Sequence, residues 1–175
     1  MLNEIEKRSK EKIPNLEIYT DGSCKSLGQN MKFGGWAFIA TRDGKEIYEA
    51  ANGERDTTNQ RMELNAIRKA LEYASQNRRP NEKVIIYSDS AYAINCYLQE
   101  WYVNWQANGW RTQSKKEVSN QDLWRDIIPY FDDFWYDFQK VEGHNGVYWN
   151  EMCDKLAQEQ ADKLKYNVPK ENTND

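Results

Sequence analysis

The order of strand-like and helix-like segments is the feature of this sequence that most constrains its fold. Three strand-like runs open the chain, and Asp43-Gly44 joins the last two with a strong hairpin signal. A helix, a strand, further helices, a strand and a last helix follow. This order predicts an α/β fold with a five-stranded mixed sheet, in which an antiparallel hairpin and parallel strands are flanked by helices. The segments are residues 16–22, 34–53, 57–76, 83–87, about 90 onward, 120–131, 137–143 and 150–165.

Length and composition indicate one domain. The chain has 175 residues, with no run of about eighteen apolar residues that would cross a membrane. We expect a charged, poorly ordered leader at 1–14, a catalytic domain at 15–165 and a polar tail at 166–175. The three cysteines are far apart and odd in number, which is typical of a reducing compartment and predicts a cytoplasmic location.

Four acidic residues are expected at one end of the sheet. Asp21 ends the first strand, Asp89 ends the fourth, and parallel strands end at the same sheet edge. Glu63 and Asp154 lie in the first turns of two helices, on their inward faces. Helix capping and the helix dipole are the simpler explanations for any one of these acids. Four acids together would repel one another unless cations joined them, and oxygen ligands suit a pair of Mg²⁺ or Mn²⁺ ions that hydrolyse a phosphodiester.

Six segments, in order, give the chain a resemblance to the type 1 ribonuclease H family, from about residue 16 to residue 164. They are YTDGSC, TTNQRMELNAI, YSDSAY, WYVNWQANGWRTQSKKEVSNQDLW, VEGHNG and NEMCDKLA. The resemblance implies a ribonuclease H-like fold with Asp21, Glu63, Asp89 and Asp154 as the metal-binding catalytic carboxylates. It also implies two Mg²⁺ ions during catalysis, replaceable by Mn²⁺, and hydrolysis of the RNA strand of an RNA–DNA hybrid to 5′-phosphate and 3′-hydroxyl ends.

His144 is the only histidine in the chain. A lone histidine in a glycine-flanked loop such as GHNG is usually a solvated surface residue. The resemblance instead implies a catalytic role, in which His144 assists proton transfer or product release near the scissile phosphate.

The resemblance also implies contacts with both strands of the hybrid. Thr58 and Asn104 match residues of a DNA-phosphate pocket, and the side chains around Asn59 match residues at the minor groove, where the 2′-hydroxyl identifies RNA. Trp101 and Trp105 match residues that line a channel for the DNA strand, and ordinary packing in the core is the alternative. For Trp110 and Trp124, packing is at least as good an explanation as a substrate contact. The implied substrate-binding residues are Cys24, Thr58, Asn59, Gln60, Trp101, Asn104 and Trp105.

Charge departs from the family pattern. The net charge of −4 would rise to 0 if four carboxylates were committed to cations. Gln106-Ala107-Asn108 stands where related enzymes often carry a basic cluster, which predicts weak binding of the hybrid.

The alternatives to a monomeric ribonuclease H are a hybrid-binding module without catalysis and another nuclease or transposase-like enzyme on the same fold. The four acids argue against a module that only binds, because they would face phosphates. The GHNG loop and the tryptophans argue against the other nucleases.

Overall fold

The computed structural model describes residues 15–141 and 147–167. The expected leader, most of the tail and the loop that contains His144 lie outside the described residues. Five strands form one sheet in the order β3-β2-β1-β4-β5. Strands β1, β2 and β3 pair antiparallel, whereas β1–β4 and β4–β5 pair parallel, which confirms the predicted mixed sheet. The strands are β1 (Asn15–Leu27), β2 (Met31–Arg42), β3 (Lys45–Arg55), β4 (Lys83–Ser88) and β5 (Tyr136–Lys140).

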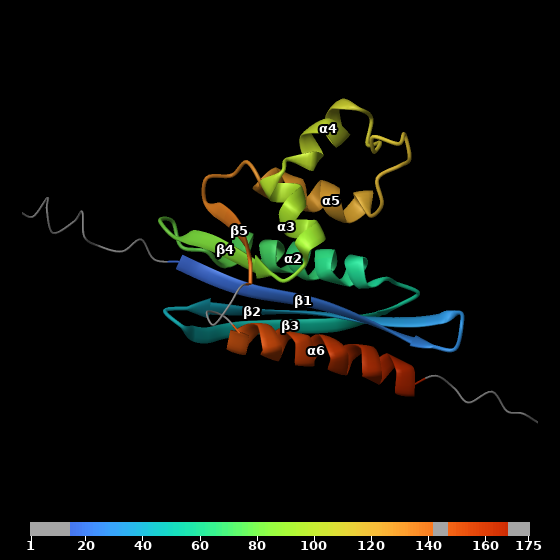
Figure 1. The fold of residues 1–175 in the computed structure, drawn as a ribbon. Helices are drawn as coiled ribbons and strands as arrows, with labels where there is room; N and C mark the ends of the chain where they lie inside the picture. The colour runs from blue at the N-terminus through green and yellow to red at the C-terminus, as the bar shows by residue number, and fades with distance from the viewer. Residues whose placement is uncertain (1–14, 142–146, 168–175) are drawn as a thin grey trace, which may run out of the picture.

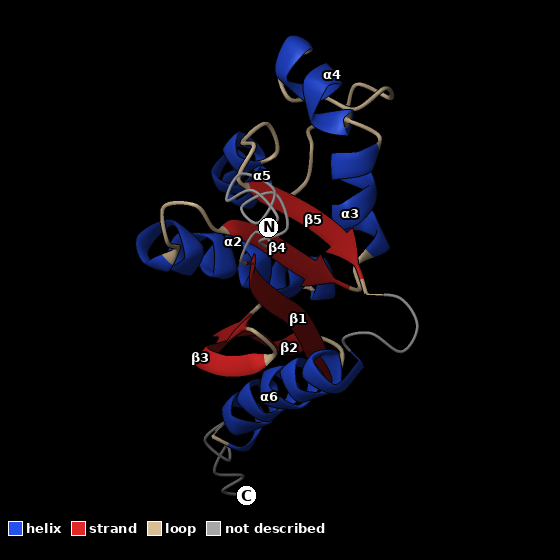
Figure 2. Ribbon diagram, turned by 90° about the vertical axis from the view of Figure 1, so that its left-hand side faces the viewer, coloured by secondary structure: helices blue, strands red, loops and turns tan. Residues whose placement is uncertain are grey.

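Helices cover both faces of the sheet. Helix α6 lies along β1, β2 and β3 on one face, and α2 crosses β1 and β2 on the other, together with α3 and α5 (Figure 1). Helix α4 lies farther from the sheet, beyond α3 (Figure 2). The helices are α2 (Asn59–Asn77), α3 (Ala91–Leu98), α4 (Trp101–Ala107), α5 (Gln121–Ile127), the short 3₁₀ helix η1 (Ile128–Tyr130) and α6 (Val147–Tyr166).

The main hydrophobic core lies between the sheet and α2, α3 and α5. Helical spacing over residues 57–76 predicts one apolar stripe of Leu64, Ile67, Leu71 and Ala74, and all four are buried on α2. A second, smaller cluster lies under α6, where Cys153 packs with Tyr19 and Ile39. Among the described residues, no helix has both the length and the apolar character needed to span a membrane.

The hairpin turn forms where the sequence indicated. Asp43 and Gly44 have φ angles of 54° and 73°, so both central residues adopt the left-handed conformation that matches strand twist. The first strand is longer than predicted, because its pairing with β2 continues to Leu27 opposite Met31. The expectation that Asp21 ends a strand was therefore wrong, since Asp21 lies inside β1.

The start of α2 also differs from the prediction. The TTNQ sequence at residues 57–60 matches a capping box between Thr57 and Gln60. The N-cap is instead Thr58, whose hydroxyl accepts a hydrogen bond from the Arg61 amide at 3.1 Å. Thr57 is buried, whereas Thr58 is exposed. The start of α2 therefore presents Thr58 to solvent.

Candidate active site

Asp21 and Asp89 lie at the same level of two neighbouring parallel strands. The last parallel pair between β1 and β4 joins Tyr19 to Tyr87, and each acid follows two residues later. The Thr20 hydroxyl donates to the Tyr87 carbonyl at 2.8 Å and ties the strands together beside the two acids. Strand register therefore places both carboxylates at one end of the sheet.

Asp89 is not the cap of the helix that follows it. Ser90 is the N-cap of α3, and its hydroxyl accepts from the Ala93 amide at 3.2 Å. Helix capping, the simpler explanation for a polar residue at this point, therefore applies to Ser90. The side chain of Asp89 is exposed and has no capping role.

Glu63 reaches this end of the sheet from the face that α2 covers. Helix α2 packs so closely on β1 that a Cβ added at Gly22 would overlap the backbone of Met62 and Glu63. Only glycine allows this approach next to Asp21. Asn59 donates to the Glu63 carboxylate at 3.1 Å and orients it from one turn earlier in the helix.

Asp154 belongs to α6, on the opposite face. A Cβ added at Gly35 of β2 would overlap the carbonyl of Ala157, so the helix backbone lies directly on the strand. The Cys153 thiol donates to the Tyr19 carbonyl at 3.2 Å, and Lys25 forms a 2.7 Å ion pair with Asp162. These contacts fix the turn of α6 that carries Asp154.

The acids influence one another's ionisation. Asp21 is 6% exposed. Burial, together with the charges of Asp89 and Asp154, raises the pKa of Asp21 to about 8, although the Gly22 amide bond opposes the shift. Partial loss of surrounding water also raises the pKa of Glu63 and of Asp89, and a neighbouring carboxylate adds to each shift. The structure therefore brings all four predicted acids within electrostatic reach, and a nearby cation would relieve their repulsion.

The donors suit a hard divalent cation, because carboxylate oxygens are the ligands that Mg²⁺ and Mn²⁺ prefer. In the part of the chain that the structure describes, however, no three His, Cys, Asp or Glu side chains are already gathered tightly enough to hold one ion. The chemistry of the side chains fits a metal site, and the metal-binding role of each acid stays a prediction.

The predicted groove contacts cluster at the start of α2. Thr58, Asn59 and Gln60 are all exposed there. Cys24 on β1 lies alongside, with its thiol 3.6 Å from the Thr57 carbonyl. These four residues adjoin Glu63 and Asp21 through α2 and β1, so a strand bound at the carboxylates could also reach them.

The other predicted substrate contacts lie in what we call the Trp-rich segment, residues 101–118. Trp101, Asn104 and Trp105 all line a cavity of about 700 Å³ between α4 and the loop that follows it. Trp105 is only 8% exposed and packs against Trp110 and Trp124, so packing accounts for most of its surface. Trp124 is completely buried, as the packing alternative predicted. A shared phosphate pocket of Thr58 and Asn104 stays untested, as does the catalytic role of His144.

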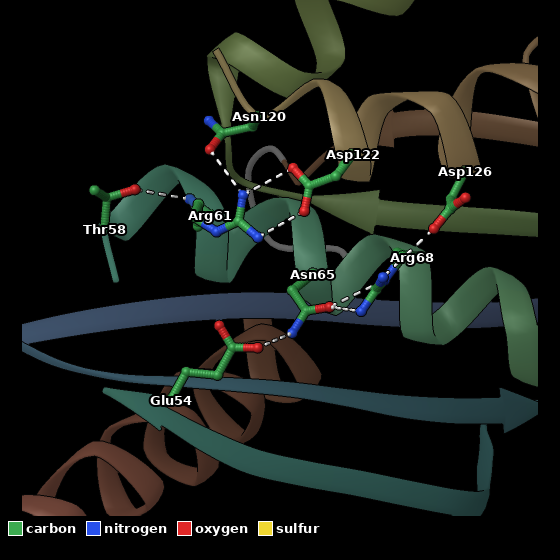
Figure 3. Close-up of polar contacts among 8 residues, drawn as sticks. All are labelled: Glu54, Thr58, Arg61, Asn65, Arg68, Asn120, Asp122 and Asp126. Carbon is green, nitrogen blue, oxygen red and sulfur yellow. Dashed lines mark hydrogen bonds and ion pairs between the residues drawn. The ribbon is translucent and has the colours of Figure 1, made fainter. Parts of the chain in front are cut away.

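The structure adds contacts that sequence reasoning missed. Arg61 and Arg68 of α2 form ion pairs with Asp122 and Asp126 of α5 (Figure 3). The signal was present in the sequence, since the two arginines are spaced by two helical turns and the two acids by one. Their pairing could not be foreseen without knowing that the two helices are neighbours.

Comparison with known proteins gives consistent matches. Residues 14–162 match the family model described as RNase H. A protein named Ribonuclease H from Syntrophomonas wolfei subsp. wolfei is 44% identical over 140 residues, which cover 80% of this chain and 91% of the relative. A protein of the same name from Acetivibrio thermocellus is 40% identical over 158 residues, which cover 90% of this chain and 100% of the relative.

The fold also matches solved structures. LC11-RNase H1, solved in complex with an RNA/DNA hybrid, aligns with a TM-score of 0.61 at 20% identity over 86% of this chain and 99% of the other. This likeness supports the fold.

Proposed function

The chain belongs to the ribonuclease H family, and we propose that it is a metal-dependent endonuclease that hydrolyses the RNA strand of RNA–DNA hybrids. The observation that carries the proposal is the convergence of Asp21, Glu63, Asp89 and Asp154 from both layers of the fold, with the pKa of Asp21 raised to about 8. A protein that only binds nucleic acid would gain nothing from acids that repel phosphates. The names of the relatives support the same activity.

The four carboxylates would act together on one phosphate. When bound, Mg²⁺ or Mn²⁺ ions would activate the attacking water and stabilise the departing 3′ oxygen. The acids hold and orient that site, and Asn59 keeps Glu63 in place. Cleavage between phosphorus and the 3′ oxygen leaves a 3′-hydroxyl on one fragment and a 5′-phosphate on the other.

The remaining predicted residues would bind the hybrid. The start of α2 contacts it through Thr58, Asn59 and Gln60, and β1 contacts it through Cys24. The cavity of the Trp-rich segment receives the DNA strand, whose sugars lack 2′-hydroxyls. His144 assists proton transfer or product release. We propose that the protein acts as a monomer in the cytoplasm.

Cleavage assays with labelled strands test this function. Hybrid, duplex RNA and duplex DNA are each incubated with Mg²⁺, with Mn²⁺ and with EDTA. We expect cutting of the RNA strand of the hybrid alone, in either metal and not in EDTA, with ends that a ligase can join. Binding of hybrid without cleavage would favour the non-catalytic module, and cleavage of duplex DNA would favour another nuclease.

A further inference from the structure

Two arginines of α2 reach the same neighbouring helix in different ways. Arg61 and Arg68 lie two turns apart on one face of α2, opposite Asp122 and Asp126 of α5 (Figure 3). Their side chains are equally exposed, at 32% each, and those of the two acids are 61% and 58% exposed. The pairs therefore form a natural comparison within one helix interface.

Only the Arg61 pair fixes an orientation. The two terminal nitrogens of Arg61 donate to the two carboxylate oxygens of Asp122, at 2.9 and 2.8 Å. A paired fork of this kind restricts angle as well as distance. Arg68 instead makes one long contact of 3.4 Å to Asp126 and gives its two shorter bonds to Asn65 of its own helix.

Arg61 also contacts one of the two surfaces that are proposed to bind the hybrid, and a residue next to the other. Its backbone amide donates to the Thr58 hydroxyl at 3.1 Å, at the start of α2. Its guanidinium donates to Asn120 at 3.3 Å, two residues after the Trp-rich segment ends. Asn120 has a φ of 61° and makes no side-chain capping bond to α5, which leaves its side-chain oxygen for Arg61.

The end of the Trp-rich segment is joined to the same part of α5. The Trp110 carbonyl accepts from the Val118 amide at 3.0 Å and from the Gln121 side chain at 3.5 Å. The Arg125 guanidinium lies 4.1 Å from the centre of the Trp110 ring. A shift at the start of α5 would therefore move the loop that closes the cavity around Trp101 and Asn104.

We propose that Arg61 is a positioning residue for substrate binding, which holds the start of α5 and the Trp-rich segment at a fixed spacing from the start of α2. One hybrid can contact both surfaces at once only at the correct spacing. Without the fork, part of the binding free energy is spent on fixing that spacing. The inference rests on the proposed function, because it takes both surfaces as hybrid contacts.

Arg61→Gln and its matched control, Arg68→Gln, test the proposal. We expect Arg61→Gln to raise the KM for hybrid by about 5- to 10-fold, the size of a modest coupling between two sites, while kcat stays within about twofold because the carboxylates are untouched. Arg68→Gln should leave KM and kcat unchanged, with a similar small change in Tm. Equal KM values for the two variants at matched Tm would overturn the proposal.

A second set of variants separates positioning from direct contact. Asp122→Asn breaks the same fork from the other side, so it should raise KM as much as Arg61→Gln, and the double variant should be no worse than either. Arg61→Lys keeps the charge without the fork, so it should restore KM only in part. A raised KM in Arg61→Gln with an unchanged KM in Asp122→Asn would mean that Arg61 touches the substrate itself, which contradicts the proposal.

The dissociation constant of labelled hybrid should be titrated in EDTA for the same proteins. This measurement needs no cleavage, so it tests the positioning role even if the proposed reaction fails. A wild-type protein that binds but does not cleave would refute the function alone, and an unchanged dissociation constant in Arg61→Gln would refute the inference alone.

Discussion

The carboxylate end of the sheet and the Trp-rich segment are held in place by different means. The four acids come from β1, α2, the end of β4 and α6, and close backbone packing at Gly22 and Gly35 sets their spacing. The Trp-rich segment is shaped by contacts between residues near one another in the chain, such as the bond from the Trp110 amide to the Trp105 carbonyl. The first region is a product of the whole fold, and the second is a local structure attached to it.

Backbone strain separates the two regions further. Among the described residues, six non-glycine residues have a positive φ, and four of them lie inside the Trp-rich segment or within two residues of its ends: Glu100, Trp110, Lys115 and Asn120. Such conformations persist only where the surroundings hold them, and they are common at binding sites. The contrast suggests that chemistry and binding can be changed independently of each other.

The largest expected effect is loss of cleavage in Asp89→Asn. The change removes ligand charge at nearly constant volume, and a lost metal contribution of several kcal/mol corresponds to about 10³-fold or more in rate. Single-turnover cleavage of hybrid in Mg²⁺ measures it, and binding in EDTA should be nearly unchanged. Turnover near the wild-type rate would contradict the assignment of the acids.

Gly22→Ala should reduce kcat more than it raises KM. The new methyl group would push Met62 and Glu63 away from Asp21, and overpacking of this kind costs roughly 1–3 kcal/mol of stability. Gly28→Ala is the control, because Gly28 has a φ of 67° but no atom within 4 Å of an added Cβ. Steady-state rates and Tm values should be measured for both variants. A fall in kcat for Gly22→Ala alone would show that the close approach of α2 to β1 sets the rate, whereas an equal fall for both would point to backbone strain.

Replacing Gln106, Ala107 and Asn108 by lysine should tighten binding of the hybrid without changing the rate of cleavage. All three residues are exposed on or just after α4. Each phosphate that is newly neutralised should steepen the dependence of log K on log[salt] by up to about 0.9, as on duplex DNA, while the single-turnover rate at saturation stays constant.

Three lysines at the far end of α2, in place of exposed Ser75, Gln76 and Asn77, provide the charge control. An equal gain in affinity from both triple variants would mean that the Trp-rich segment does not face the hybrid.

The smallest expected effect is on the stability of the metal-free protein. With the folded-state pKa of Asp21 raised to about 8, the folded protein keeps a proton that the unfolded chain releases near pH 4. Stability therefore falls as pH rises between these values, and Asp21→Asn removes the loss. In EDTA the Tm of the variant should exceed that of the wild-type protein, and this gain should be larger near pH 9 than near pH 5.

Asp122→Asn should behave in the opposite way, because the hydrogen bond from Arg61 lowers the pKa of Asp122. Compared with the wild-type protein, the variant should be slightly less stable near neutral pH. The difference should vanish at a pH below the pKa of Asp122 in both the folded and the unfolded wild-type protein. A Tm gain in Asp21→Asn that does not grow with pH would mean that carboxylate repulsion is not its source.

Much of the architecture could be predicted because periodicity and turn chemistry are local. The buried stripe of α2 and the Asp43-Gly44 turn needed only neighbouring residues. Strand ends and helix starts singled out the four acids, and the resemblance implied their role. The structure places them within electrostatic reach of one another.

Features that depend on distant partners were missed. The length of β1 depends on its antiparallel pairing with β2, so Asp21 was expected at a strand end. The choice of Thr58 over Thr57 as N-cap depends on which threonine is buried. Tryptophan and lysine carry no signal for left-handed backbone, so the shape of the loop around Trp110 and Lys115 could not be foreseen.

The close packing of α6 on Gly35 has a consequence for how the protein is made. Asp21 lies near the start of the described chain and Asp154 near its end, and Asp154 takes its place only when α6 docks on the sheet. Domains generally fold as units, while ribosomes add about 5–20 residues per second. Until α6 has been made and has docked, the nascent chain therefore lacks one of the four acids, and it should be unable to cut a nucleic acid.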